Sequence, residues 1–358
     1  MSDERWALPE GLGPTGVSTG RLWAADGRLT ADPVAGAGAQ CLPGRLALIG
    51  GLVDAHFHMA FLYGAVPVDM DAALDQLRAA RDQGVLLVRD LGAHDRLSLK
   101  VSDDAGLPRV IGSGQHIAVA GGFLEGSHEP VPPERLVGGA MAEMDAGATW
   151  VKVITDWQPG ELAYPLAVLK EMVAAVHARG GRVAAHAERT GHDVLEAGVD
   201  SIEHGFNLEE SDLREMARRG VAWAPTTNLF VRDLQHVDEM LAANEDPDRR
   251  VRLQEWRQGV VDQFDGLART VPLAARLGVR LLASTDTCGT VADEVERWIN
   301  WGVDPQVALG AASWDARRYL LRDEPASADV VTFEADPRED PGTLRQPAAI
   351  VLRGRRIL

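Results

Sequence analysis

Residues 198–204, with the sequence GVDSIEH, contain the structural unit that decides the fold. Gly198 can end a helix because glycine readily adopts the left-handed backbone conformation. The run that follows suits a strand buried on both faces, and it ends in the polar side chains of Glu203 and His204. The unit occurs six times, and two further runs resemble its strand. The eight predicted strands are residues 52–56, 85–90, 109–113, 150–154, 182–186, 199–204, 221–225 and 279–284.

Eight short strands that alternate with helices over about 250 residues match the size of a (β/α)8 barrel. We therefore predict an α/β fold in which a TIM barrel spans residues 51–324. An open, doubly wound sheet is the structural alternative, but it seldom carries polar residues at the ends of so many strands. Residues 1–50 and 325–358 contain short β-like runs with too few hydrophobic side chains to fold alone. We predict that these two ends of the chain pair into one small composite β-domain.

The composition is that of a globular protein, since 46% of the 358 residues are hydrophobic. No long apolar run predicts a membrane span, and residues 1–5 show no secretory signal pattern. Two cysteines, Cys41 and Cys288, are too few for a disulfide framework, which favours a reducing cytoplasm. The net charge of −17 argues against nucleic acid as a partner, so a small-molecule partner is expected. The sequence leaves a homo-oligomer open.

Four histidines and one aspartate occur at the carboxyl ends of the predicted strands. His56 and His58 alternate along the first strand, so both imidazoles point the same way. His186 and His204 end the fifth and sixth strands, and Asp286 ends the eighth. Because all strand ends of a parallel barrel meet at one rim, four of the ten histidines converge there with the aspartate. Imidazole and carboxylate groups are common ligands of zinc and related ions, so the sequence predicts a metal site.

Lys152 is the most informative position because it lies inside the apolar run 150–154. A bare ammonium group would be costly there unless it were paired. Burial near cations lowers the pKa of a lysine, and the neutral amine can then react with carbon dioxide. The resulting carbamate has two oxygens that can bridge two metals. The alternative is an ordinary ion pair between Lys152 and a neighbouring carboxylate such as Glu203.

The motifs at these strand ends resemble the amidohydrolase superfamily over nearly the whole chain. They are residues 51–58 (GLVDAHFH), 150–153 (WVKV), 185–187 (AHA), 201–205 (SIEHG) and 284–287 (STDT). Residues 199–205 are especially similar to the imidazolonepropionase-like branch, which includes enzymes of the Xaa-Pro dipeptidase type. The resemblance implies two divalent metal ions, zinc first, with manganese, cobalt or iron as alternatives. The implied ligands are His56 and His58 for the first metal, His186 and His204 for the second, carboxylated Lys152 as the bridge, and Asp286 on the first metal.

The implied activity is hydrolysis of an amide or peptide carbon–nitrogen bond in a dipeptide or an N-acyl amino acid. A hydroxide that bridges the two metals would attack the carbonyl carbon. Asp286 would act as general acid and base by taking the hydroxide proton and passing it to the leaving group. One departure bears on peptide specificity. The peptidase relatives often show Gly-Gly-His after the third strand, whereas this chain has Gly121, Gly122 and Phe123.

Several residues follow the strand ends on the rim side and are candidates for substrate contact. They are Tyr63, His116, His128 and Asn228, with Arg89 and Arg232 as further candidates. Cys288 lies two residues after Asp286 and has no evident base partner in the sequence, so we interpret it as a wall residue and not as a nucleophile.

Three alternative functions stay open. A mononuclear deaminase or cyclic-amide hydrolase, like imidazolonepropionase, would use the same histidines and Asp286 with an uncarboxylated Lys152. A lactonase or phosphotriesterase would use the same ligands. A metal-free scaffold protein is disfavoured, because all six ligand positions are present.

Overall fold

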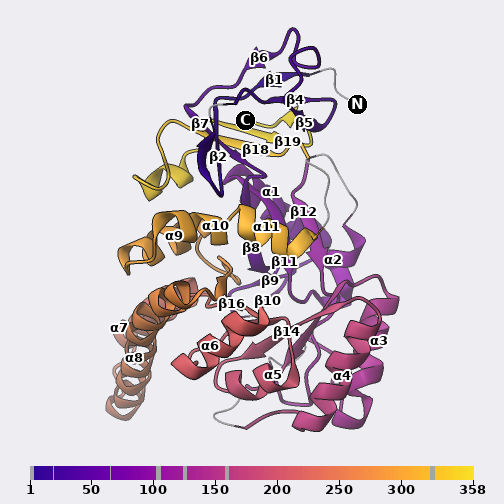
Figure 1. Ribbon diagram of the computed structural model, residues 1–358. Coiled ribbons are helices and arrows are strands. Elements are labelled where there is room, and N and C mark those ends of the chain that lie inside the picture. The colour runs from indigo at the N-terminus through magenta and orange to yellow at the C-terminus, as the bar shows by residue number, and fades with distance from the viewer. Residues whose placement is uncertain are drawn as a thin grey trace.

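The computed structural model describes residues 4–18, 20–64, 66–101, 106–123, 127–157, 161–322 and 327–358. Eight strands occupy the places predicted for the barrel (Figure 1). They are β8 (Leu52–Phe57), β11 (Val85–Asp90), β12 (Arg109–Gly112), β13 (Trp150–Ile154), β14 (Arg182–Ala187), β15 (Ser201–His204), β16 (Ala222–Ala224) and β17 (Arg280–Leu281). The last three are shorter than predicted. Strand β17 stops early because the amide of Ala283 donates to the carbonyl of Ala311 and not to a neighbouring strand.

Backbone hydrogen bonds arrange the eight strands in two parallel sheets, of order β12-β11-β8 and β13-β14-β15-β16-β17. The sheets join at both edges. At one edge, the amide of Ala55 donates to Ala283 at 3.0 Å and the amide of Asp286 donates to His56 at 2.7 Å. At the other edge, the amide of Ile117 donates to the carbonyl of Lys152 at 2.8 Å. The arrangement is a TIM-barrel-like α/β fold, which brings the carboxyl ends of the strands to one rim.

Helices cover the outside of the strands (Figure 1). They are α1 (Met70–Asp82), α2 (Leu97–Lys100), α3 (Leu136–Asp145), α4 (Leu166–Ala178), α5 (Gly191–Ala197), α6 (Glu210–Arg219), α7 (Asn228–Ala242), α8 (Pro247–Leu277), α9 (Val291–Asn300), α10 (Pro305–Ala311) and α11 (Trp314–Leu321). Gly220 and Gly278 end α6 and α8 with φ angles of 74° and 81°, as predicted for helix-ending glycines. In the described part of the chain, no helix is both long and apolar enough to cross a membrane.

The interior of the strand ring is filled by buried side chains below the rim. Val53, Leu87, Trp150 and Ala184 are all fully buried in this layer. Arg89 lies among them, with its guanidinium carbon 4.4 Å from the centre of the Trp150 ring. The sequence placed Arg89 at the rim as a candidate for substrate contact. That placement is wrong because Arg89 is the fifth residue of the buried strand β11 and is 0% exposed.

Strands from the two ends of the chain pair with one another beside the barrel (Figure 1, top). One sheet has the order β20-β19-β18-β7-β2-β3 and the other β5-β4-β1-β6. Their bounds are β1 (Trp6–Ala7), β2 (Glu10–Gly13), β3 (Gly16–Ser18), β4 (Trp23–Ala25), β5 (Arg28–Thr30), β6 (Gln40–Cys41), β7 (Leu46–Ile49), β18 (Val330–Phe333), β19 (Ala349–Leu352) and β20 (Arg355–Arg356). A small cluster that includes Trp6, Ala47, Val330 and Val351 is buried between them. A separate two-stranded piece, β9 (Phe61–Leu62) with β10 (Val66–Pro67), lies next to the rim.

Candidate active site

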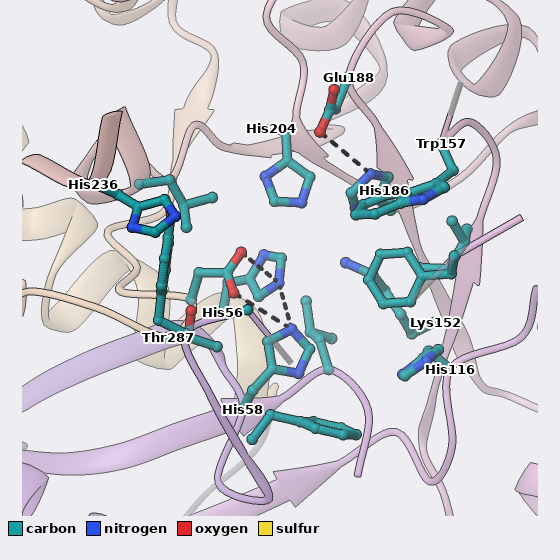
Figure 2. A pocket seen from close by; sticks show the side chains of 18 of the residues that line it. His56, His58, His116, Lys152, Trp157, His186, Glu188, His204, His236 and Thr287 are labelled. Carbon is teal, nitrogen blue, oxygen red and sulfur yellow. Dashed lines mark hydrogen bonds and ion pairs between the residues drawn. The ribbon is translucent and has the colours of Figure 1, made fainter. Parts of the chain in front are cut away.

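The six residues predicted as metal ligands line one cavity of about 420 Å³ at the carboxyl ends of the strands (Figure 2). Strand β8 carries His56, and His58 follows it directly. Strands β13, β14 and β15 carry Lys152, His186 and His204. Asp286 lies beyond β17 and forms a parallel bridge with Phe57, which brings its carboxylate beside the first two histidines. Residues far apart in the sequence therefore meet because each one occupies the same end of its strand.

Short distances separate the nitrogen and oxygen atoms of this cluster. His56 Nε2 lies 3.2 Å from His58 Nε2. The two carboxylate oxygens of Asp286 each lie 3.8 Å from one of these nitrogens. The ring centres of His186 and His204 are 4.3 Å apart. His56, His204 and Asp286 each offer one ligand atom, and these three atoms lie within 4.8 Å of one another, which is a spacing suited to a metal ion.

The protonation states of the cluster fit metal binding. Burial lowers the pKa of His56, His186 and His204 well below the usual value, with a further contribution from neighbouring positive groups. These imidazoles are therefore neutral near pH 7, which is the form that binds metals. Burial likewise lowers the pKa of Lys152 to about 8, so a neutral amine is accessible there.

Three buried nitrogens of the cluster have no hydrogen-bond partner among the residues that the structure describes. They are Lys152 Nζ, His186 Nε2 and His56 Nδ1, of which the last lies near a carboxylate oxygen of Glu203. The carboxylates nearest to His186 Nε2 belong to Asp156 and Glu188, at 3.9 and 3.8 Å, too far for hydrogen bonds. Glu203 is engaged elsewhere, so its predicted alternative pairing with Lys152 is not found. Buried polar atoms are rarely left unpaired, and a group of such atoms beside one cavity fits a metal site.

Two hydrogen bonds and one close ion contact behind the cluster orient three imidazoles. Nδ1 of His58 donates to the carbonyl of Gly92 at 3.0 Å, and Nδ1 of His204 lies 2.8 Å from the hydroxyl of Thr226. Nδ1 of His56 lies 2.9 Å from a carboxylate oxygen of Glu203. A proton held on Nδ1 by a carbonyl or carboxylate leaves the lone pair on Nε2, which faces the cavity.

Glu203 itself belongs to a fully buried network beneath the cavity. Its carboxylate accepts hydrogen bonds from Arg89 at 2.9 Å and from the hydroxyl of Ser201 at 2.6 Å. Both Arg89 and Glu203 are 0% exposed. Neither side chain contacts solvent, so each charge depends on the other for compensation.

Glu203→Gln should lower the free energy of unfolding by about 3–5 kcal/mol because Arg89 would keep its buried charge and lose its counter-charge. Chemical denaturation of the two proteins measures this difference. Glu215→Gln is the matched control, since Glu215 pairs with Arg218 and Arg219 on the surface of α6, and it should change stability little. Equal effects of the two substitutions would contradict the role assigned to the buried network.

Three residues at the same strand ends have a strained backbone. His204, Thr226 and Asp286 adopt positive φ angles of 71°, 48° and 58°. Non-glycine residues rarely occupy this region, and each such conformation costs about 1–3 kcal/mol. Two of the three are candidate ligands, and the third contacts one of them. The rest of the fold stabilises a conformation that these residues would otherwise avoid, as is common at functional sites.

The four residues predicted to contact substrate separate into two pairs. Tyr63 and His116 line the cavity. His128 does not, and its ring is held by the Ser127 hydroxyl at 3.2 Å. Asn228 does not line it either, because its amide donates to the carbonyl of Thr290 and accepts from Arg297.

Cys288 also lies outside the cavity wall, and its thiol is unsuited to nucleophilic attack. Burial, with Asp286 nearby, raises the pKa of this thiol. A raised pKa keeps the sulfur protonated near pH 7, and only the thiolate is nucleophilic. The interpretation of Cys288 as a wall residue is therefore wrong, whereas this finding agrees that it is not a nucleophile.

Several wall residues escaped the prediction from sequence. They are Phe61, Leu91, Phe123, Ile154, Trp157, Glu188, Leu229, His236, Trp256 and Thr287. Trp157 lies three residues after the end of β13, and Glu188 lies one residue after the end of β14, so their positions relative to these strands were a usable signal. Burial and the neighbouring Asp156 raise the pKa of Glu188 to about 7. Trp256 comes from the middle of α8, and no strand-end pattern could have identified it.

Comparison with known proteins gives a consistent picture. A model of the amidohydrolase family matches residues 47–327. An uncharacterized protein of Mycobacterium tuberculosis is 36% identical over 368 residues, which cover 96% of this chain and 94% of the relative. Mycobacterium bovis has a protein with the same identity and coverage.

Solved structures with a similar fold include enzymes named for peptide hydrolysis. A putative prolidase from Bifidobacterium longum matches with a TM-score of 0.80 at 23% identity, covering 99% of this chain and 95% of that one. A Xaa-Pro dipeptidase with bound methionine in the active site gives 0.79 at 18% identity, covering 99% of both chains. The ochratoxinase of A. niger matches with a TM-score of 0.77 at 18% identity, covering 99% of this chain and 95% of that one. At these low sequence identities, the similarity establishes a shared fold and not a shared activity.

Proposed function

The chain belongs to the amidohydrolase family and is a hydrolase of carbon–nitrogen bonds, and we propose that it cleaves the amide bond of a small molecule with the help of a binuclear metal centre. The observation that carries this proposal is the convergence of four histidines, Lys152 and Asp286 on one cavity. Similarity of fold to a Xaa-Pro dipeptidase and a prolidase supports an amide or peptide bond as the target.

The proposed centre holds two divalent ions, with zinc as the first choice. His56 and His58 would bind one ion together with Asp286, and His186 and His204 would bind the other. Carboxylated Lys152 would bridge them, which gives its buried and unpartnered Nζ a function. When bound, such ions polarise a carbonyl group and make water acidic enough to supply a nucleophile near pH 7.

The side chains around the centre have distinct proposed tasks. Asp286 accepts the proton of the attacking water and delivers it to the leaving nitrogen as general base and general acid. Glu203, through His56, keeps a ligand nitrogen aimed at the cavity. Tyr63 and His116 are the wall residues that we assign to substrate contact. The aromatic wall limits the access of bulk water to the reacting bond.

The same reasoning extends to the domain organisation. We infer that residues 51–324 form the catalytic (β/α)8 barrel and that residues 1–50 and 325–358 form a small separate β-domain. The hydrogen bonds between the two parallel sheets support the barrel. The pairing of β7 with both β2 and β18 supports the β-domain.

Hydrolysis by metal-loaded protein tests the proposal. Protein purified with zinc and bicarbonate should cleave members of a panel of dipeptides, N-acyl amino acids and N-acyl amines. Dialysis against a chelator should reduce turnover to background, and added zinc should restore it. Turnover confined to lactones, phosphotriesters or cyclic amidines would move the assignment to one of the alternative hydrolase classes.

A further inference from the structure

Aromatic side chains flank the ligand cluster on two sides (Figure 2). Trp157 lies beside His186, and the rings of Trp157 and Phe123 are 4.7 Å apart. Phe123 also contacts His186 edge to face, with ring centres 5.6 Å apart. On the other side, the ring centres of His236 and Trp256 are 6.2 Å apart. The cavity therefore offers an aromatic, apolar surface beside the predicted metal ligands, against which a ring of a bound molecule can pack.

The charged groups of the cavity wall are acidic. Glu188 and Asp286 line the cavity, and Asp233 lies directly behind it, where it accepts a 2.6 Å hydrogen bond from Tyr63. Whether ionised or protonated, these groups offer no positive charge to a bound anion. Among the described lining residues Lys152 is the sole lysine or arginine, and it belongs to the ligand cluster. The neighbouring segments 124–126 and 158–160 have the sequences LEG and QPG and add no basic residue.

Each basic group near the wall has an acidic neighbour. Arg232 lies over the ring of Tyr63 at 4.9 Å and is 3.7 Å from Glu239. His236 also faces Glu239, at 4.0 Å. Arg189 lines an adjoining groove together with Glu188 and Asp233. His116 is buried, and its pKa is lowered well below the usual value by that burial, so its ring is neutral.

Apart from Lys152 of the ligand cluster, a substrate carboxylate would therefore meet no basic side chain in this cavity that lacks an acidic neighbour. Removing an ionised carboxylate from water is costly unless it is paired, and nearby carboxylates increase the cost. If the metal ions polarise the scissile carbonyl, as proposed, they would not be free to compensate a carboxylate as well. On the premise of the proposed function, we propose that the substrate is an amide with an apolar group of aromatic size and no carboxylate next to the scissile bond. This narrows the dipeptides and N-acyl amino acids expected from the sequence to carboxylate-free amides.

A matched pair of amides tests the proposal by binding and by turnover. N-acetyl-2-phenylethylamine and N-acetyl-L-phenylalanine share the ring and the amide and differ in one carboxylate. Calorimetric titration of the zinc-loaded Asp286→Asn protein should give at least about a tenfold lower Kd for the uncharged amide, which corresponds to about 1.4 kcal/mol. With wild-type protein, kcat/KM should favour the same compound by a similar factor or more. Equal or tighter binding of the acid, or no binding of either compound, would overturn the proposal.

The binding readout separates this proposal from the proposed function. Preferential binding of the uncharged amide without its hydrolysis by the wild type would support the cavity assignment and contradict amide cleavage. Hydrolysis of both compounds with equal kcat/KM would support amide cleavage and contradict the proposed preference for an uncharged amide.

A variant with a basic wall should weaken the preference for the uncharged amide. The Trp256 side chain lines the cavity and is 41% exposed, so an arginine there can keep its charge partly hydrated. Trp256→Arg should lower the ratio of the Kd of the acid to the Kd of the uncharged amide at least about fivefold. Trp256→Leu removes the ring without adding charge and should leave this ratio unchanged. An unchanged ratio in Trp256→Arg, or the same narrowing in both variants, would argue against charge as the source of the selectivity.

Discussion

Asp286→Asn should lower kcat by about 10²–10⁴-fold while the protein keeps most of its metal. The amide has nearly the shape of the carboxylate and still offers one oxygen to a metal, but it cannot accept and return a proton at neutral pH. Asp286 is suited to that task, because its two oxygens lie 3.8 Å from the cavity-facing nitrogens of His56 and His58. Steady-state kinetics together with elemental analysis of the same preparation measure both quantities.

Asp233→Asn is the matched control for this experiment. Asp233 is partly buried near the cavity, and it accepts a hydrogen bond from Tyr63, yet it is not among the residues that line the cavity. The same chemical change there should alter kcat by less than about tenfold. Near-wild-type turnover in Asp286→Asn would remove the proton-transfer role. Loss of metal in parallel with loss of activity would leave Asp286 as a ligand and no more.

The sequence was informative wherever strand geometry dictates position. A parallel strand ring forces the carboxyl ends together, so His56, His186 and His204 could be placed at one rim from their spacing relative to short apolar runs. The family assignment, which depended on those motifs, is confirmed by the match over residues 47–327. Lys152 stood out for a different reason, since a lysine in an apolar strand needs a special environment.

The sequence was uninformative where packing between distant segments decides position. Arg89 follows the same alternation as its apolar neighbours, and only the three-dimensional structure shows that its partner is Glu203 beneath the cavity. Asn228 directly precedes cavity residue Leu229, yet its amide turns towards Thr290 because Arg297 and that carbonyl satisfy it. Trp256 reaches the wall from α8 through the packing of α7 against α8, which no local pattern encodes.

Lys152→Ala should reduce the metal content from about two ions per chain to about one or fewer. The alanine removes the only group that could supply a bridging carbamate, and it leaves the four histidines in place. Elemental mass spectrometry on protein purified with bicarbonate and without chelator measures the content. Lys170→Ala is the control, because Lys170 forms an exposed ion pair with Glu196 and should bind metal like the wild type.

A second experiment compares the metal content with and without bicarbonate. It separates a bridging role for Lys152 from a packing role. If the lysine acts through its carbamate, wild-type protein prepared without bicarbonate should lose metal and regain it when bicarbonate is added. Lys152→Ala should not respond, and Lys152→Glu, which carries a permanent carboxylate, should bind metal independently of bicarbonate. The pKa of about 8 held by burial makes this reaction accessible near neutrality, because a neutral amine is the form that adds carbon dioxide. About one ion per chain in the wild type and in Lys152→Ala alike would instead favour a mononuclear centre, in which the buried lysine contacts a single metal site as an amine.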